Sequence, residues 1–129
     1  MNPDTISILS KYDINTEVLD LSNKNIEGIL DLNKFEYLKK IICLKNKITD
    51  LQYNLDKLIY LDCSNNLIKR LIGVYDTINY LNCSSNPIEE LYYPFDVKPK
   101  SYPKTLKKII FGYGFNCPVD NLNFGVEKT

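Results

Sequence analysis

The sequence contains no histidine, no tryptophan and no alanine, and Arg70 is its one arginine. Histidine is the commonest general base near neutral pH and a frequent zinc ligand, so its absence argues against many hydrolytic and zinc-dependent sites. The chain has no glycine-rich phosphate loop after a predicted strand and no Cys–His cluster. We therefore expect no catalytic residues, no cofactor and no bound metal, and hence no enzyme.

The sequence also has no excess of charge of either sign, since 16 Lys and Arg residues balance 16 Asp and Glu residues. Proteins that bind duplex nucleic acid through its phosphates usually need a basic surface, so we expect no nucleic-acid partner. Long hydrophobic runs are absent, which argues against a membrane span. The N-terminus lacks the basic and apolar regions of a secretory signal, so we expect a cytoplasmic protein with reduced cysteines.

An internal repeat dominates the rest of the sequence. The stretch "YLDCSNNLIKRL" at 60–71 returns as "YLNCSSNPIEEL" at 80–91, in register and twenty residues later. A copy also precedes the first stretch by twenty residues, and a degraded copy lies twenty-two residues before that one. The aligned positions are Thr16, Leu19, Leu21, Lys24, Ile26 and Ile29; Leu38, Ile41, Cys43, Asn46, Ile48 and Leu51; Leu58, Leu61, Cys63, Asn66, Ile68 and Leu71; and Ile78, Leu81, Cys83, Asn86, Ile88 and Leu91.

These copies resemble the leucine-rich repeat, L-x-x-L-x-L-x-x-N/C-x-L. The resemblance implies an α/β-type repeat solenoid: a right-handed coil with a parallel β-sheet on its concave face and few or no full helices on its convex face. The apolar positions alternate as a strand with one buried face does, and parallel strands would stack about 4.8 Å apart.

The segment "LKKIIFGYGFNCPV" at 106–119 resembles the FNIP repeat, itself a leucine-rich-repeat variant of amoebal and giant-virus proteins. We therefore divide the chain into an N-terminal cap (1–15), four leucine-rich repeats (16–91), a Pro-rich connection (92–105) and an FNIP-like fifth coil with a C-terminal cap (106–129). Asn2 or Asp4 could cap a short helix near Pro3, whose apolar residues would cover the first coil. The candidates for that cover are Ile6, Leu9, Tyr12 and Ile14.

The most faithfully repeated polar residues have a structural interpretation. An asparagine amide both donates and accepts hydrogen bonds, so it can satisfy backbone groups where the chain leaves each strand. We expect Asn46, Asn66 and Asn86 to form one internal ladder and Cys43, Cys63 and Cys83 to form another. A thiolate column could alternatively hold a soft metal or change redox state. The apolar interior favours Cys as a small buried side chain instead.

The outward strand positions are the candidates for function, because they would form the concave face. They mix apolar, aromatic and polar groups, and tyrosine is enriched where proteins meet partners. The predicted partner-binding residues are Ile42, Leu44, Tyr60, Asp62, Tyr80, Asn82, Lys108 and Ile110. Ordinary cross-strand packing is the alternative interpretation of this strip.

The expected function is a non-catalytic protein-interaction scaffold whose protein partner the sequence does not identify. The FNIP resemblance implies a viral adaptor or decoy in host ubiquitin pathways, because in that family the repeats accompany F-boxes and select ubiquitin-ligase substrates. The rival interpretation is a structural solenoid that associates with copies of itself. A metal or redox protein built on the cysteine column is the third. We expect a monomer or weak self-association and no membrane partner.

Overall fold

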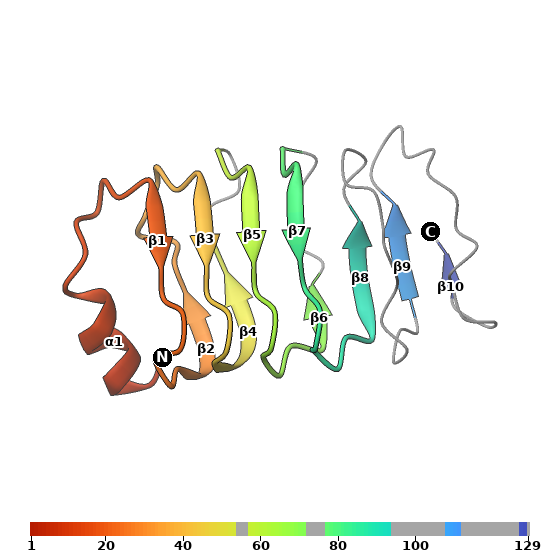
Figure 1. The fold of residues 1–129 in the computed structure, drawn as a ribbon, viewed down its shortest axis with the longest axis horizontal. Helices are drawn as coiled ribbons and strands as arrows, with labels where there is room; N and C mark the ends of the chain where they lie inside the picture. The colour runs from red at the N-terminus through yellow and green to blue at the C-terminus, as the bar shows by residue number, and fades with distance from the viewer. Residues whose placement is uncertain (54–56, 72–76, 94–107, 112–126, 129) are drawn as a thin grey trace.

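The computed structural model describes residues 1–53, 57–71, 77–93, 108–111 and 127–128, and they form a parallel β-solenoid with very little helix (Figure 1). The predicted repeat solenoid is thereby confirmed. In chain order the elements are α1 (Pro3–Leu9), β1 (Val18–Asp20), β2 (Glu27–Asp31), β3 (Lys40–Ile42), β4 (Lys47–Gln52), β5 (Tyr60–Asp62), β6 (Arg70–Leu71), β7 (Tyr80–Asn82), β8 (Glu90–Tyr93), β9 (Lys108–Phe111) and β10 (Glu127–Lys128).

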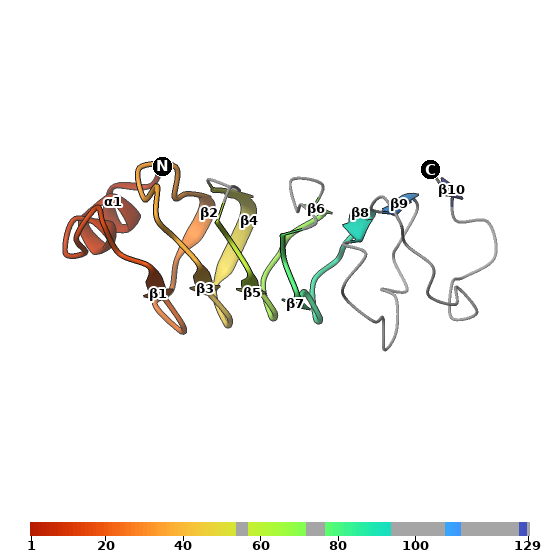
Figure 2. The same cartoon turned by 90° about the horizontal axis from the view of Figure 1, so that it is seen from above.

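One side of the solenoid is a parallel sheet in the order β1-β3-β5-β7. Its strands pair without irregularity, and Leu19, Ile41, Leu61 and Leu81 fall in one inward row. The row reproduces the spacing of twenty-two, twenty and twenty residues read from the sequence. The remaining strands lie on the opposite side of the coil (Figure 2). Among the described residues, the core therefore lies between two sides that each contribute a leucine or an isoleucine from each of the four repeats.

That opposite side is divided into two sheets. β2 pairs with β4, and a second sheet has the order β10-β9-β8-β6. Between the coils that carry β4 and β6, the Leu67 N–H still donates to the Ile48 carbonyl oxygen at 2.8 Å. The strands that follow belong to different sheets, so the β4–β6 junction is a seam in the hydrogen-bond ladder.

In the first copy of the repeat, the last buried apolar residue lies one position later than the repeat spacing predicts. β2 pairs Gly28 with Ile48 and then Ile29 with Asp50, so the register shifts between Gly28 and Ile29. Gly28 has φ +76°, a conformation that glycine adopts without the strain that a Cβ would bring. Leu30 is consequently buried opposite Leu51, while Ile29 is 44% exposed. The assignment of Ile29 to the core is wrong.

The N-terminal cap forms as a helix of one to two turns. The Asn2 side chain accepts a hydrogen bond from the Asp4 N–H at 2.8 Å, with Pro3 at the first helical position, as predicted. Leu9 is fully buried and Tyr12 packs partly buried against the same core. Ile6 and Ile14 are 51% and 60% exposed, so their assignment to this cover is wrong. Ile6 falls on the solvent side because the helix presents Leu9 to the first coil, and Ile14 lies beyond the helix.

The fifth strand position is not where the sequence analysis placed it. Placing Lys108 and Ile110 on the concave face put this segment beside the strands that became β5 and β7, but β9 pairs with β8 and places Ile109 opposite Leu91. The alternation of apolar residues in this segment fits either side of the coil, so the pattern could not decide between them. Most of the Pro-rich connection and of the FNIP-like segment lies outside the described residues.

The asparagine ladder forms as predicted. Each amide binds backbone groups of its own coil and of the coil before it, as the middle member shows. The Asn66 oxygen accepts from the Ile48 N–H at 3.0 Å, and its nitrogen donates to the Cys43 and Cys63 carbonyl oxygens at 3.0 and 3.1 Å. Asn46 and Asn86 repeat this arrangement one coil earlier and one coil later. The amides therefore fasten successive coils where the chain leaves the first sheet.

Across the part of the chain that the structure describes, no helix has the length and apolar character needed to cross a membrane.

Candidate interaction face

The outward side of the β1-β3-β5-β7 sheet, here called the outer sheet face, carries two rows of side chains set by the strand register. The first row is Val18, Lys40, Tyr60 and Tyr80, and the second is Asp20, Ile42, Asp62 and Asn82. Each row contains one residue from every strand, because side chains on a strand alternate between faces. The face thus gathers residues from positions more than sixty apart in the sequence.

An aromatic stack occupies the first row. The rings of Tyr60 and Tyr80 lie parallel, 4.1 Å apart between centroids with an interplanar angle of 6°. The Lys40 ammonium lies over the Tyr60 ring at 4.3 Å from its centroid. Desolvation, followed by the neighbouring Tyr80 hydroxyl, raises the pKa of Tyr60 above its usual value. Tyr60 is therefore enclosed between a cation and a ring, whereas Tyr80, 40% exposed, ends the stack.

The second row is built from a repeated polar pair. The Asp20, Asp62 and Asn82 side chains each accept from both the N–H and the hydroxyl of the serine two residues later, with hydroxyl contacts of 2.6 to 2.7 Å. The Ser22 hydroxyl, first among the causes, lowers the pKa of Asp20. These side chains hold the turn after each strand, so local structure already uses one of their oxygens.

The second coil departs from this pair at both of its positions. Ile42 and Leu44 stand where the other coils have an acidic or amide residue and a serine. Both side chains are partly exposed. In this coil two apolar side chains therefore replace the hydrogen-bonded polar pair. They make the outer sheet face partly apolar beside the Lys40–Tyr60–Tyr80 row.

Six of the eight predicted partner-binding residues belong to the first sheet or the turn that follows its strands. They are Ile42, Leu44, Tyr60, Asp62, Tyr80 and Asn82. Lys108 and Ile110 belong to β9, which extends the opposite side, so the prediction that they share this face is wrong. Lys40 was missed as a member of the site. The available signal was that Lys40, Tyr60 and Tyr80 follow one another at intervals of twenty residues.

Charged groups at the rim of the face are solvent-exposed and paired. The Lys39 ammonium lies 2.9 Å from a Glu17 carboxylate oxygen, and both side chains are more than half exposed. The hydrogen bond from Lys39 lowers the pKa of Glu17. Exposed pairs of this kind are screened by solvent, so this one contributes little to the stability of the fold.

The cysteine column lies inside the coil. Cys43 and Cys63 are fully buried and Cys83 is partly buried, and all three are free thiols. Burial raises the pKa of Cys43 to about 12 and that of Cys83 to about 11, and it raises that of Cys63 as well. Thiols so shifted are protonated at neutral pH and react slowly. Within the described residues no group of three or more His, Cys, Asp or Glu side chains could hold a metal ion.

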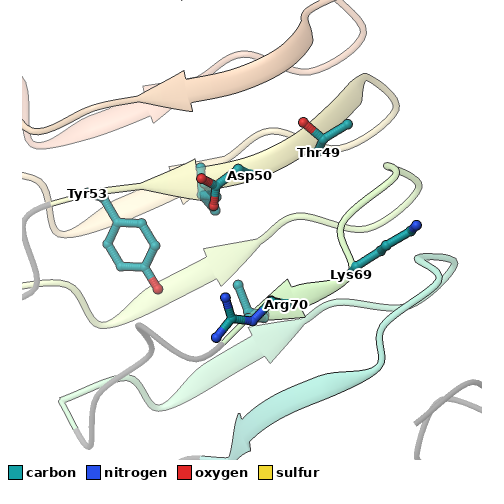
Figure 3. A pocket seen from close by; sticks show the side chains of 7 residues that line it. Thr49, Asp50, Tyr53, Lys69 and Arg70 are labelled. Atoms are coloured by element: carbon teal, nitrogen blue, oxygen red, sulfur yellow. The ribbon is translucent and has the colours of Figure 1, made fainter. Parts of the chain in front are cut away.

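The structure also contains a hollow that the sequence gave no reason to expect. It encloses about 270 Å³ at the β4–β6 seam (Figure 3). The lining residues are Thr49, Asp50, Leu51, Tyr53, Lys69, Arg70 and Leu71. Arg70 pairs with Glu90. The Tyr53 hydroxyl is buried, and among the described residues it has no hydrogen-bond partner. Burial first, and then the nearby Cys63 and Cys43 thiols, raises the pKa of Tyr53.

Comparison of this chain with family models, with curated proteins and with solved structures found no match.

Proposed function

We propose that this chain is a leucine-rich-repeat interaction module that binds a protein partner through the outer sheet face. The observation that carries the proposal is the Lys40–Tyr60–Tyr80 row. It presents flat aromatic surface with an exposed end, on a sheet that is otherwise held rigid by its ladders. Tyrosines on rigid elements lose little conformational freedom on binding, which is one reason why they recur as anchors of protein interfaces.

The assignment to the leucine-rich-repeat class rests on two properties. The aligned copies follow L-x-x-L-x-L-x-x-N/C-x-L, and the Asn at the variable N/C position makes the coil-to-coil contacts described above. The FNIP-like segment at 106–119 makes a component of the ubiquitin pathway the first partner to test, in a viral or amoebal setting. A non-catalytic role is supported by the lack of histidine and by thiols whose raised pKa keeps them protonated.

The test compares Tyr80→Ala with the matched control Tyr37→Ala. Both tyrosines are similarly exposed, at 40% and 44%, and among the described residues each makes one ring contact: Tyr80 with Tyr60, and Tyr37 with the Lys57 ammonium. Immobilised wild-type protein and both variants are exposed to the same cytosol, and captured proteins are quantified by mass spectrometry. We expect a set of proteins held by wild type and by Tyr37→Ala but lost from Tyr80→Ala.

A urea melt of each variant separates loss of binding from loss of structure. Removing the stacked ring should lower the free energy of unfolding of Tyr80→Ala by about 0.5–1.5 kcal/mol, which leaves the domain folded. If the same proteins are captured by Tyr80→Ala, or if Tyr37→Ala loses them equally, the outer sheet face is not the binding surface.

A further inference from the structure

The backbone holds the two rings of the Tyr60–Tyr80 stack in register. β5 and β7 lie side by side in the first sheet (Figure 1), and their pairing sets the Tyr60 Cα opposite the Tyr80 Cα. The Asn79 and Tyr80 N–H groups both donate to the Ile59 carbonyl oxygen, at 2.9 and 3.3 Å. The two side chains therefore leave the sheet from equivalent points of adjacent, hydrogen-bonded strands.

The ring geometry brings equivalent carbon atoms face to face. The ring planes lie within 6° of parallel, and the centroids are 4.1 Å apart. Burial, and then a hydrogen bond with the Tyr80 hydroxyl, raises the pKa of Tyr60, so the two hydroxyl groups are neighbours. In parallel rings that point the same way, the carbons next to the hydroxyl groups, the ortho carbons, lie opposite one another.

The other tyrosines whose side chains the structure describes have different surroundings. Tyr12 packs partly buried against the core, and Tyr53 is buried within it. Tyr37 is exposed, and its ring contacts the Lys57 ammonium. Among the described residues, the stack of β5 and β7 is thus the one place where two tyrosine rings lie against each other.

We propose that Tyr60 and Tyr80 form a site of oxidative modification, at which one-electron oxidation joins the two rings as dityrosine. The oxidant is of the class that a haem peroxidase generates from hydrogen peroxide. The new bond joins two neighbouring coils of the solenoid covalently. The inference goes beyond the proposed function and does not depend on it.

The reaction balances with hydrogen peroxide as the oxidant. Each ring gives up one electron and its hydroxyl proton, and each phenoxyl radical shares its unpaired electron with the ortho carbons. The two radicals combine into one bond between an ortho carbon of Tyr60 and one of Tyr80. The hydrogen on each joined carbon then moves to the oxygen and restores the phenol. One C–C bond thus replaces two C–H bonds, and the two electrons and two protons convert one hydrogen peroxide into two waters.

The sheet supplies the proximity that this coupling needs. Holding two reacting groups in position turns an encounter between molecules into a step within one molecule, which is favoured by orders of magnitude. The Tyr60 ring has the Lys40 ammonium 4.3 Å from its centroid and the Tyr80 ring stacked against it, so Tyr80 is its coupling partner. Tyr80 is 40% exposed, which gives the oxidant access to the pair.

The experiment treats the full-length protein with a haem peroxidase and hydrogen peroxide, without a thiol reductant. Trypsin separates Tyr60 from Tyr80, because Lys69 and Arg70 lie between them. Mass spectrometry should find the two peptides joined with the loss of two hydrogen atoms, and fragment ions should place the bond at these two tyrosines. The linked product should have the mass of one chain, and its yield should not fall when the protein is diluted.

Phenylalanine variants keep a ring in the stack but remove the hydroxyl that must be oxidised. In Tyr60→Phe and Tyr80→Phe, dityrosine fluorescence within the monomer should appear at least tenfold more slowly than in wild type. The matched control Tyr37→Phe removes an exposed tyrosine outside the stack and should leave the rate unchanged. In the double variant Lys40→Tyr with Tyr80→Phe, the link should form between positions 40 and 60, because the strand register sets those positions opposite each other.

The linked protein should also be harder to unfold. The bond closes a loop between positions twenty residues apart, and a cross-link of this kind restricts the unfolded chain. We expect a higher urea midpoint for the linked protein than for the unmodified protein. An unchanged or lower midpoint would show that the bond forms only in a distorted sheet, which contradicts coupling within the native stack.

Three further results would overturn the proposal. The first is a product that consists of linked dimers, or a yield that falls on dilution. The second is a bond in the wild-type protein that maps to tyrosines other than Tyr60 and Tyr80. The third is an unchanged rate in Tyr80→Phe, or an equal loss of rate in Tyr37→Phe. None of these results bears on whether the outer sheet face captures a partner, so the proposed function is tested separately.

Discussion

Replacing Asn46 by alanine should be the most damaging substitution in the asparagine ladder. Its oxygen accepts from the Lys24 and Ile26 N–H groups, both at 3.0 Å, and its nitrogen donates to the Leu21 carbonyl oxygen at 2.9 Å. Asn46→Ala would leave the buried Ile26 N–H and Leu21 carbonyl without partners among the described residues. Each such group costs about 1–3 kcal/mol, so the two together predict a loss of about 2–6 kcal/mol in the free energy of unfolding. The Cys43 carbonyl keeps its bond to the next asparagine.

Alanine at the other two ladder asparagines should lower the free energy of unfolding less, because fewer backbone groups lose their partners. In Asn66→Ala only the Ile48 N–H loses its partner, because the Cys63 carbonyl still accepts from Asn86 at 2.9 Å. That single group predicts a loss of about 1–3 kcal/mol. Asn86→Ala removes the bond to the Ile68 N–H in a coil that is partly exposed, so its cost should lie near 1 kcal/mol.

Urea unfolding followed by far-ultraviolet circular dichroism measures this series, with Asn33→Ala as the control. Asn33 is exposed, and within the described residues its side chain makes no hydrogen bond, so its replacement should change stability by less than about 0.5 kcal/mol. The expected order of damage is Asn46, Asn66, Asn86 and then Asn33. Equal losses of stability at the three ladder positions, or a reversed order, would refute the idea that the number of backbone groups left without a partner sets the loss.

Four further outcomes follow from single side chains. Tyr53→Phe should raise the free energy of unfolding by about 1 kcal/mol in a urea melt, because the buried hydroxyl lacks a partner among the described residues; a loss of stability would contradict this. Lys45→Asn should stabilise by about 0.5 kcal/mol, because Lys45 has φ 57°, where asparagine is better tolerated. A thiol reagent read out by mass spectrometry should modify Cys83 before Cys43, since Cys83 is partly exposed and its pKa is about 11 rather than about 12. The lowered pKa of Asp20 means that its small contribution is present above about pH 4 and lost as pH falls through the folded value, so Asp20→Asn should be less sensitive than wild type between pH 4 and pH 2; identical urea midpoints across that range would count against it.

The solenoid and its asparagine ladder could be predicted because the residues that make them repeat in register. The need for an inward apolar residue at Leu61 and for an amide at Asn66 recurs in the neighbouring coils, so similar side chains return and their roles can be read from spacing. The order of the inward row followed from the repeat spacing. The capping role of Asn2 followed from a different signal, the asparagine directly before Pro3.

The misses have a common physical origin in choices that spacing leaves open. Ile29 and Leu30 are both apolar, and the backbone conformation of Gly28 decides which is buried. The alternation in β9 fits either side of the coil, and pairing with β8 decides it. The role of Lys40 depends on the aromatic ring in the next coil, a contact between positions far apart in sequence.

The seam between β4 and β6 has a mechanical consequence. At this junction the coils are tied by a full ladder on the β3–β5 side, but across the coil the strands fall into separate sheets. Because strand pairing joins the two coils on only one side, the solenoid should bend most easily at this junction, in the direction that opens or closes the β4–β6 side. We therefore expect the solenoid to flex as two stiff halves about this junction, with the β3–β5 ladder as the hinge line.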